Sequence, residues 1–410
     1  MNVIEDLLDS LAPKGCPFFE LQELFDIRNG YTPSKANAEY WNEGDIPWFR
    51  MEDIRANGRV LGHALQQVPE KAIKGGKSKL FPANSILVAT SATIGEHALV
   101  TVPHISNQRF TSLAIKSSFT NRLNSKFAFY YCFLLADWCL RNTTTSSFAS
   151  VDMAGFRKFK FPVPPLEVQE KIVEILDTFS SLEAELEAEL EARRKQYEFY
   201  RNQLLTFPLQ GVRWVPMGEF ATLVRGNGMP KTDFSQNGVP AIHYGQIYTH
   251  YGTAATRTIS FVGVETASKL AKVEPGDIVI TNTSENIEDV GKAVAWLGDE
   301  TAVTGGHATV IKHQENPQYL AYYFQTHEFA LAKKKWATGT KVIDVSAKNL
   351  AKIEIPLPSR ADQDRIAALL KNFELLVSDI SIGLPAELAA RRKQYAYYRN
   401  KLLTFREIEA

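Results

Sequence analysis

The segment RRKQYEFYRNQLLTF at residues 193–207 returns as RRKQYAYYRNKLLTF at residues 391–405, an offset of 198. Twelve of the fifteen positions are identical, since only the pairs 198/396, 199/397 and 203/401 differ. A match of this length indicates a duplicated structural unit, which must be found before any shorter motif is interpreted. We therefore expect a chain that contains two copies of one architectural plan.

The similarity continues upstream at a slightly different offset. FPVPPLEVQEKIVEILDTF at residues 161–179 matches IPLPSRADQDRIAALLKNF at residues 355–373, an offset of 194. The difference of four residues predicts a short insertion in the second copy, for which ISIGLPAEL at residues 380–388 is a suitable place. Gly383 and Pro385 are expected to break or restart a helix there.

Each repeated segment predicts a long helix with an apolar stripe, because apolar residues recur at steps of three and four. A helix from about residue 167 to 207 would be roughly 60 Å long. The stripe residues expected to pack between helices or to dock a partner are Ile172, Leu176, Phe179, Leu182, Leu186, Leu190, Tyr197, Leu204, Ile366, Leu370, Phe373, Leu388, Tyr395 and Leu402.

Neither stripe is stable when exposed to water, so we expect the two helices to pack on one another as an antiparallel coiled coil. The alternative is that each helix merely covers its own domain. The expected fold is therefore of the α+β class, with two α/β domains joined by two long helices and related by a pseudo-twofold internal repeat.

The domain organisation follows from the repeat. The expected segments are an N-terminal amphipathic segment at 1–14, a first domain at 15–160, a central long helix at 161–211, a second domain at 212–354 and a C-terminal long helix at 355–410. We call 15–160 head 1 and 212–354 head 2. Both heads contain strand-like runs between Gly and Pro residues. The heads diverge far more than the helices, as two heads that address different targets at a fixed separation would.

Composition limits the function classes. With 410 residues the chain is multidomain, and its 46 basic and 46 acidic residues cancel, so a grip on nucleic acid must be local. Five glutamates in residues 183–191 contribute to this neutrality. Cys16, Cys132 and Cys139 lack disulfide or zinc-site spacing and are expected to be buried fillers. Without a membrane-length apolar run or a signal peptide pattern, a cytoplasmic protein is expected.

The chain could be an enzyme or a protein that only binds its partners, and the sequence lacks the motifs that would indicate an enzyme. The Pro-Pro pair at 164–165 is followed by Leu166 rather than the aromatic residue of an adenine methyltransferase turn. GGKS at residues 75–78 lacks the glycine spacing of a P-loop, because Lys71 stands where the first glycine is required. The eight histidines form no metal-ligand motif. We assign no catalytic residue and no metal.

A run of short motifs characterises head 1. These are GYTPSK at 30–35, YW at 40–41, GDIPWF at 44–49, DI at 53–54, ATIG at 92–95, SNQRF at 106–110 and FPVPPLEVQ at 161–169. In this order, and followed by the duplicated RRKQY helix, they resemble the type I restriction-modification specificity-subunit family over nearly the whole chain. Head 2 departs from the pattern. RGNGMPK at 225–231 replaces the TPS turn, GVPAIHYGQI at 238–247 replaces DIPWF, and TGGHAT at 304–309 stands where head 1 has SNQRF.

The resemblance implies a DNA-specificity subunit in which each head is a target-recognition domain. The helices would be spacers that also bind methyltransferase subunits. The partners implied are double-stranded DNA, two modification subunits and, for cleavage, motor-nuclease restriction subunits. S-adenosylmethionine, ATP and Mg would be used by those partners, so no cofactor is expected on this chain. A pure scaffold is the second alternative, and it explains the helices but not the two divergent heads.

DNA contacts are sought among polar side chains on loops, because phosphate contacts position a protein and contacts to base edges specify the sequence. In head 1 the best cluster is Asn107, Gln108 and Arg109, since Asn and Gln suit adenine and Arg suits guanine. The other DNA-binding candidates in head 1 are Arg28, Asn29, Thr32, Lys35, Lys77, Thr144 and Ser146. The candidates in head 2 are Asn227, Lys231, His243, Tyr244, Gln246, Asn282, Thr283, His307, Thr340 and Lys341. Lys333, Lys334 and Lys335 are expected to follow the DNA backbone.

Overall fold

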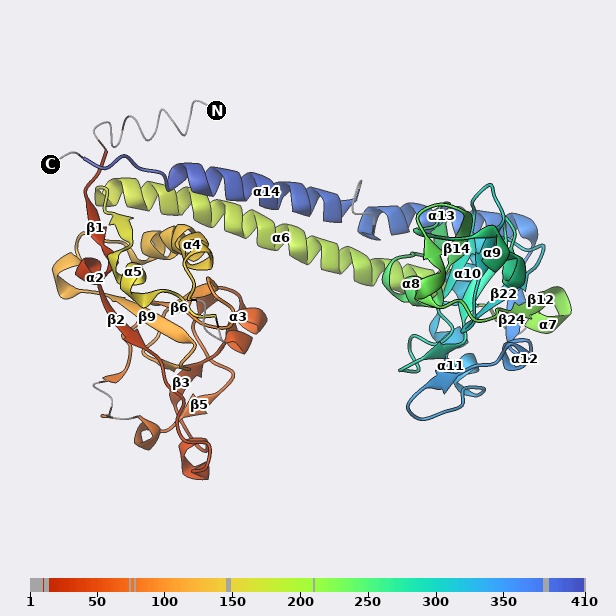
Figure 1. Ribbon diagram of the computed structural model, residues 1–410, viewed down its shortest axis with the longest axis horizontal. Helices are drawn as coiled ribbons and strands as arrows, with labels where there is room; N and C mark the ends of the chain where they lie inside the picture. Colours follow the sequence, from red (N-terminus) through yellow and green to blue (C-terminus); the bar gives the residue numbers. More distant parts are fainter. Residues whose placement is uncertain are drawn as a thin grey trace. The chain divides into compact units, whose positions relative to one another are not determined.

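The computed structural model of the protein describes residues 10, 15–73, 75–76, 79–144, 149–208, 211–378 and 383–408 (Figure 1). The expected amphipathic segment at 1–14 lies outside the described residues except for Ser10, and so do Lys77 and Ser146. The chain divides into two compact units. Unit 1 comprises Met1–Glu185 and Ala389–Ala410, and unit 2 comprises Leu186–Leu388.

Head 1, in unit 1, is an α/β domain built around a five-stranded sheet of order β2-β9-β6-β7-β4. A smaller sheet has the order β5-β3-β8, and β1 pairs with β10. The elements are β1 (Phe18–Glu20), α2 (Leu21–Leu24), β2 (Phe25–Asn29), β3 (Ile46–Phe49), α3 (Met51–Asn57), β4 (Val60–Leu61), β5 (Gln67–Val68), β6 (Ser85–Ala89), β7 (His97–Val100), β8 (Ile105–Ser106), β9 (Phe110–Ile115), α4 (Ser125–Arg141), α5 (Met153–Lys158) and β10 (Lys160–Pro162).

Head 2, in unit 2, has a five-stranded sheet of order β12-β22-β18-β20-β15 and a second sheet of order β13-β16-β14-β21-β17. Its elements are β11 (Arg213–Pro216), α7 (Met217–Phe220), β12 (Thr222–Arg225), β13 (Phe234–Ser235), β14 (Val239–Ile242), α8 (Tyr244–Thr249), β15 (Ala254–Ala255), β16 (Ser260–Val262), α9 (Val264–Lys269), β17 (Ala271–Val273), β18 (Ile278–Thr281), β19 (Thr283–Ser284), β20 (Ala293–Trp296), β21 (Ala302–Thr304), β22 (Ala308–Lys312), α10 (Pro317–Tyr323), α11 (His327–Lys334), β23 (Ile343–Asp344), α12 (Ala347–Leu350) and β24 (Glu354–Leu357).

The two heads share one topology although their sequences differ. The central strands β6 and β18 are buried along their whole length. Their neighbours correspond, because β6 lies between β9 and β7 and β18 lies between β22 and β20. In the two sheets that contain β6 and β18, the edge strands β4 and β15 are parallel to their partners, whereas all other strand pairs are antiparallel. In the second sheet of each head, β3 with β8 and β14 with β21 form corresponding parallel pairs. The internal repeat therefore includes the heads as well as the helices.

The long helices are present as expected. α6 (Leu166–Leu205) is continuous over 40 residues, and the C-terminal segment forms α13 (Arg360–Ser378) and α14 (Leu384–Leu402). α14 begins directly after Gly383, with Pro385 in its first turn, as the sequence predicts. The rest of the stretch between the two helices, residues 379–382, lies outside the described residues.

In unit 1 the first half of α6 packs against α14 (Figure 1). The ring of Phe179 stacks on Tyr398 at a centroid distance of 6.1 Å and lies 5.9 Å from the ring of Tyr395. One turn further along α6, Glu183 bonds to Arg392. Residue 179 of α6 contacts residue 398 of α14, whereas residue 183 contacts residue 392, so the two helices run antiparallel.

In unit 2 the second half of α6 packs against α13. The rings of Tyr200 and Phe373 stack at a centroid distance of 6.0 Å. Tyr197 and Leu205 of α6 also share a hydrophobic core with Leu370 of α13 and with residues of head 2. The long helices therefore pack on one another, as expected. They also cover the heads, which was part of the alternative.

The apolar stripe differs from the expected one at two positions. Leu182 is 55% exposed, and Leu205 rather than Leu204 is fully buried. The burial of Leu205 reflects head 2, because a helix that also packs on a domain buries a wider and shifted face. Leu176, Leu190, Leu370 and Leu388 are buried as predicted.

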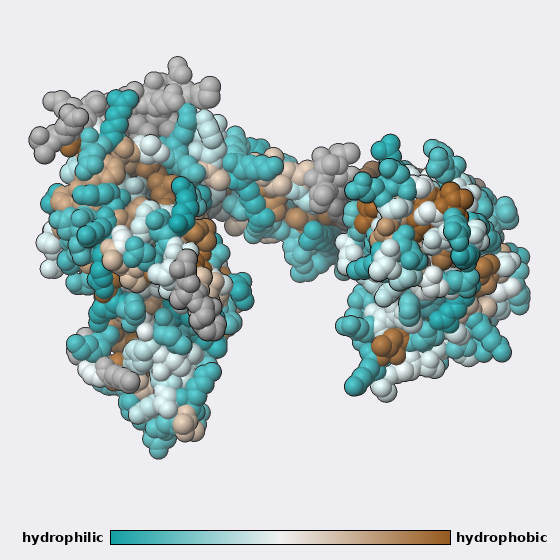
Figure 2. All heavy atoms as spheres, viewed as in Figure 1, coloured by the Kyte–Doolittle hydropathy of each residue, from teal (hydrophilic) through white to brown (hydrophobic). Residues whose placement is uncertain are grey.

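The interior and the surface have ordinary chemistry. The three cysteines are free and buried, as expected. On the face shown in Figure 2, hydrophilic side chains predominate over each unit, and hydrophobic ones appear in small patches. Within the described part of the chain, no helix combines the length and apolar character that crossing a bilayer requires.

Candidate nucleic-acid interface

One turn occupies the same place in both heads and forms the centre of the candidate interface. It comprises residues 106–110 in head 1, called turn 1, and residues 304–308 in head 2, called turn 2. The backbone N–H of Thr90 donates to the carbonyl of Arg109 at 3.0 Å, and that of Asn282 donates to the carbonyl of His307 at 2.7 Å. Arg109 and His307 are therefore structurally equivalent, in agreement with the placement of TGGHAT opposite SNQRF in the sequence.

A glycine packs under each turn. The N–H of Gly30 donates to Phe110 and that of Gly226 to Ala308, both at 2.9 Å. A Cβ atom at Gly30 would lie 2.2 Å from the carbonyl oxygen of Asn107, and one at Gly226 would lie 2.0 Å from that of Gly305. Because any side chain would collide with the turn, both positions require glycine. The adjoining backbone therefore helps to hold each turn in place.

Turn 1 presents polar side chains on a defined backbone. The side chain of Asn107 accepts a hydrogen bond from the Arg109 N–H at 3.1 Å, which shapes the turn. Gln108 is bonded to the Thr32 hydroxyl, so these two candidates support each other. Arg109 is exposed, and no bond of its guanidinium to another described residue is recorded. Arg109 is thus the side chain of turn 1 that is best suited to meet a base.

Two other head 1 candidates contribute to the fold. Arg28 donates to the carbonyls of Lys79 and Leu80 and lies over the Phe81 ring at 4.7 Å. Asn29 accepts a hydrogen bond from the Thr111 hydroxyl at 2.9 Å. We interpret Arg28 as a side chain that anchors the loop bearing Lys79, because its guanidinium is already used within the head.

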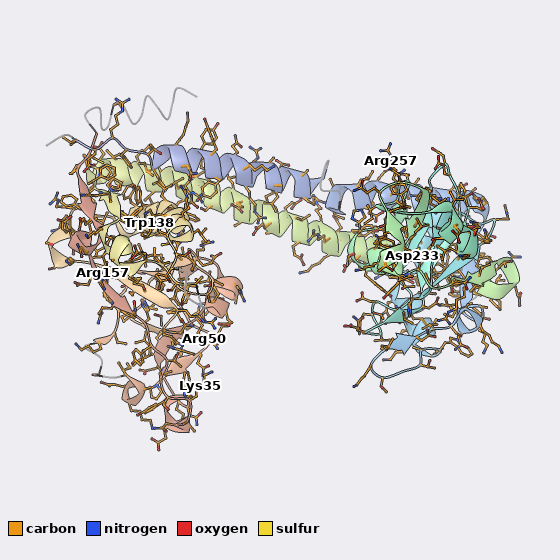
Figure 3. All side chains as sticks on the ribbon, in the orientation of Figure 1. Lys35, Arg50, Trp138, Arg157, Asp233 and Arg257 are labelled. Carbon is orange, nitrogen blue, oxygen red and sulfur yellow. The ribbon has the colours of Figure 1, made fainter. Side chains whose placement is uncertain are left out.

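Lys35 and Thr144 lie on loops of head 1. Lys35 is exposed, and Figure 3 shows it with Arg50 in the part of head 1 built by β3 and β5. Thr144 bonds to Ser150 across the mouth of a loop whose tip lies outside the described residues. Arg50, which the sequence reasoning missed, precedes α3 and lies over the Trp48 ring at 5.2 Å.

Turn 2 combines histidine and aromatic side chains. His307 is exposed at a positive φ of 68°, an unusual conformation for a residue other than glycine. Its ring lies 4.9 Å from Tyr244, and its Nδ1 is 2.9 Å from the Thr283 hydroxyl. The ring of His243 lies 4.5 Å from that of Tyr244 in a tilted arrangement, and burial followed by the charge of Lys231 lowers the pKa of His243. Four of the head 2 candidates are therefore brought together.

The remaining head 2 candidates separate into two groups. Asn282 is fully buried and bonds to Val345 and Thr309, and Gln246 bonds to the Ser260 hydroxyl, so both serve the fold. Asn227 donates to the carbonyl of Lys269 at 2.8 Å. The exposed candidates are Lys231, Thr340 and Lys341.

Lys333 does not lie on the surface as the sequence suggested. It is buried, and its Nζ donates to the carbonyls of Glu288 and Val290. Burial lowers its pKa to about 8. Lys334 and Lys335 are exposed, so only these two could follow a DNA backbone.

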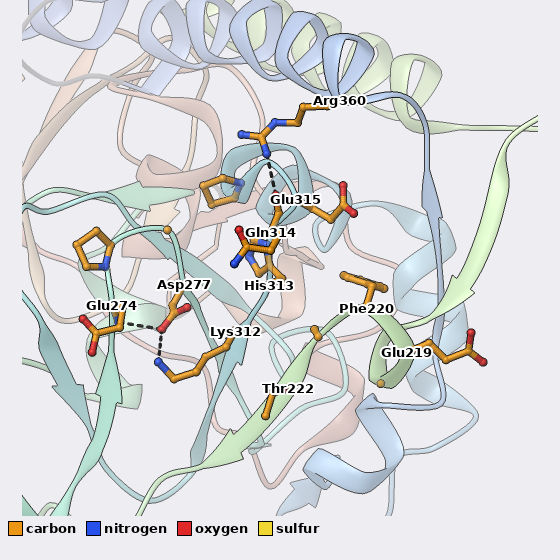
Figure 4. A pocket seen from close by; sticks show the side chains of 15 residues that line it. Glu219, Phe220, Thr222, Glu274, Asp277, Lys312, His313, Gln314, Glu315 and Arg360 are labelled. Atoms are coloured by element: carbon orange, nitrogen blue, oxygen red, sulfur yellow. Dashed lines mark hydrogen bonds and ion pairs between the residues drawn. The ribbon is translucent and has the colours of Figure 1, made fainter.

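Figure 4 shows a polar pocket of about 770 Å³ in unit 2. Its lining includes the ion pair between Lys312 and Asp277, in which Nζ and Oδ2 are 2.8 Å apart. Within the described ranges, no group of three or more His, Cys, Asp or Glu side chains is arranged to hold a metal ion. We assign the pocket no catalytic role.

A known protein family matches both halves of the chain. The model of the type I restriction modification DNA specificity domain matches the chain twice, at residues 13–192 and 211–390. The chain therefore belongs to the type I restriction-modification DNA specificity family, whose members are non-catalytic specificity subunits.

Two relatives illustrate the similarity. The type I restriction enzyme EcoprrI specificity subunit of Escherichia coli is 57% identical over 218 residues, which are 50% of this chain and 53% of that protein. The EcoR124I/EcoR124II specificity subunit of Escherichia coli is 31% identical over 281 residues, which are 64% of this chain and 69% of that protein. The chain thus spans about half the length of the first relative.

Solved structures with the same fold cover nearly the whole chain. A chain from a study of complex assembly and conformational transition of the type I R-M system has a TM-score of 0.66 at 16% identity. It is matched over 95% of this chain and 98% of its own length. The HsdS subunit from Thermoanaerobacter tengcongensis has a TM-score of 0.52 at 16% identity, over 96% of this chain and 97% of that one. At this identity the similarity concerns the fold alone.

Proposed function

We propose that this chain reads a bipartite DNA site, with each head recognising one half-site. The observation that carries the proposal is that two heads of one topology present an equivalent turn with different side chains. Turn 1 offers Arg109 where turn 2 offers His307. Equal frames with unequal contact residues are suited to reading two different sequences.

The proposed contacts divide into two kinds. Arg109 and Asn107 in head 1, and His307, Thr283 and Tyr244 in head 2, are the proposed base-reading side chains, because direct readout uses such groups in the grooves. The proposed phosphate contacts are the exposed Lys35, Lys231, Thr340 and Lys341. The proposed boundaries of the heads are 15–160 and 212–354.

The helices are proposed to fix the length of the unread spacer. A frame with two related heads would place the half-sites on one face of the duplex, roughly one turn or about 34 Å apart. The same helices are proposed to dock two methyltransferase subunits, and motor-nuclease subunits would join for cleavage. S-adenosylmethionine, ATP and Mg are proposed to be used by those partner subunits. The complex is proposed to work in the cytoplasm.

The test is a methylation assay with the chain assembled with the methyltransferase subunits of its own system. We expect transfer of methyl groups to adenines in a two-part motif with an unread spacer of constant length. A chain that assembled with these subunits but directed methylation to one continuous motif, or to none, would contradict the proposal. A pure scaffold would give the second of these results.

A further inference from the structure

Each head is joined to its long helix by a buried glutamine at the same position of the repeat. Gln169 lies in the first turn of α6 and Gln363 in the first turn of α13, and 194 residues separate them, the offset of this part of the repeat. Their exposed fractions are 0% and 1%. A buried amide must have its hydrogen bonds satisfied, so the partners of these side chains show what they hold together.

The two glutamines make matching hydrogen bonds. Oε1 of Gln169 accepts from the backbone N–H of Asn124 at 2.8 Å, and Oε1 of Gln363 accepts from that of Asn316 at 3.0 Å. Nε2 donates to the carbonyl five residues earlier, that of Pro164 in one copy and of Pro358 in the other. A further bond from Nε2 reaches the segment before the head helix in both copies.

The partners of the glutamines are the residues that begin the head helices. Asn124 caps α4 by accepting from the N–H groups of Lys126 and Phe127, and Asn316 caps α10 by accepting from that of Tyr319. Each glutamine therefore ties the start of a long helix to the start of a head helix. Figure 4 shows this region of unit 2, where Arg360 of α13 also donates to the carbonyl of Gln314 at 2.8 Å.

A second tie lies further along the same helices. The Tyr130 hydroxyl donates to Oδ1 of Asp177, and the Tyr322 hydroxyl donates to Oε2 of Glu374, both at 2.7 Å. Tyr130 and Tyr322 each stand six residues after the capping asparagine of their helix. Burial raises the pKa of both tyrosines above the usual range, so each hydroxyl keeps its proton and remains a donor.

We propose that these two ties make each head and its long helix one rigid piece, and that Gln169, Tyr130, Gln363 and Tyr322 are positioning residues for spacer length. The inference rests on the proposed function. Two separated ties prevent a head from rocking about a single contact. Neighbouring spacer lengths differ by one base pair, about 3.4 Å along the duplex. A head that rocked on its helix would accept more than one of these lengths.

The experiment measures spacer preference with the full chain assembled with its methyltransferase subunits. Methylation rates are compared on duplexes that carry the native half-sites with the native spacer or with one base pair more or less. Tyr130→Phe, Tyr322→Phe and the double variant each remove only a hydroxyl. We expect the ratio of the methylation rate at the native spacer to the rate at a neighbouring spacer to fall about tenfold in the double variant, which corresponds to about 1.4 kcal/mol. The half-site bases should remain unchanged.

Matched controls separate positioning from folding. Tyr397→Phe changes a tyrosine of α14 that is 49% exposed, and it should leave the spacer preference unaltered. Gln169→Met with Gln363→Met removes the first tie, and Gln203→Met makes the same change at an exposed position of α6. If the glutamine variants do not fold, the tyrosine variants decide the matter alone.

Three results would overturn the inference. The tyrosine double variant could fold and assemble normally with an unchanged spacer preference, it could slow methylation equally at all spacers, or it could change the bases read. Failure of the proposed function gives a different result, because the wild-type chain would then direct methylation to no two-part motif.

Discussion

Arg392 of α14 donates a hydrogen bond to Glu183 of α6, with 2.6 Å between Nε and Oε1. Arg392 belongs to the duplicated RRKQY motif, and Glu183 is the first of the five glutamates of residues 183–191. Glu183 therefore pairs with the basic motif of α14 within unit 1, whereas Glu189 and Glu191 pair with Arg193 and Lys195 of α6 itself. The side chains of Glu183 and Arg392 are partly exposed, so the pair contributes to register more than to stability.

The apolar seam should account for most of the stability of the helix pair. Leu176 is fully buried, so Leu176→Ala should lower the free energy of unfolding of unit 1 by about 2–5 kcal/mol. Leu182→Ala makes the same change at an exposed position, where we expect an effect within about 0.5 kcal/mol. Thermal and urea denaturation of both variants measure the difference. Equal losses at the two positions would mean that the helix faces are assigned incorrectly.

Arg109 should read a base in the half-site of head 1. Arg109→Ala should weaken binding to the specific duplex by about 1–3 kcal/mol and relax one base of one half-site, because arginine pairs with guanine through two bonds. Titration of the assembled complex with duplexes substituted at each position measures the effect. Arg157→Ala, at an exposed position on α5, is the control. A uniform loss on all duplexes would instead indicate a phosphate contact.

Exchange of a head should change one half-site only. When residues 15–160 are replaced by the corresponding head of a relative, methylome sequencing should find a motif in which one half is new and the other is retained. The physical reason is that head 2 has its own core. A change in both halves, or in neither, would show that the heads do not read DNA independently.

A longer helix should lengthen the spacer. Insertion of Leu-Glu-Ala-Glu after Glu189 continues the local sequence and adds about 6 Å of helix. One base pair rises about 3.4 Å, so we expect a spacer longer by one or two base pairs. The motif found by methylome sequencing checks this. Altered half-site bases at the original spacing would refute the role of the helix as a spacer.

Acid should destabilise head 1 through two buried histidines. Burial is the main cause that lowers the pKa of His97 to about 3 and that of His104 to about 4. Below pH 6.5 the unfolded chain binds protons that the folded chain does not. Each histidine therefore lowers the free energy of unfolding by up to about 1.4 kcal/mol per pH unit as the pH falls toward its folded-state pKa. Above about pH 6.5 both histidines are neutral in the folded and the unfolded chain, so this loss of stability is absent.

Substitution should isolate the effect of His97, whose ring contacts the rings of Phe129 and Phe133. His97→Phe removes the titrating group, so the melting temperature should fall less steeply between pH 7 and pH 5 than in the wild type. His63→Phe, at an exposed position, is the control. An unchanged slope in His97→Phe would show that other groups cause the acid sensitivity.

Much of the architecture could be predicted from the sequence, because helix periodicity and a duplicated motif are local signals. The bounds of α6 follow from the stripe, and Gly383 with Pro385 marks the restart of the second helix. The repeat and the family resemblance predict that the two heads share a fold, but the order of their strands could not be predicted from local signals. It depends on strand pairing between distant residues, and the paired strands have different sequences in the two heads.

The candidate contacts were predicted less well, because exposure depends on tertiary packing. Arg28, Asn282 and Lys333 have side chains typical of DNA contacts, yet each is used inside its head. Arg50 carried a signal that was overlooked, since it directly follows the GDIPWF motif. The correspondence of Arg109 and His307 follows from the placement of TGGHAT opposite SNQRF, and their backbone hydrogen bonds agree with it.

The most direct test of a two-headed DNA reader is the methylated motif produced by the wild-type chain with the methyltransferase subunits of its own system, read by single-molecule sequencing of the modified DNA. The account predicts two short specific sequences separated by an unread spacer of one constant length. A single uninterrupted motif, or two sequences at variable separation, would contradict it.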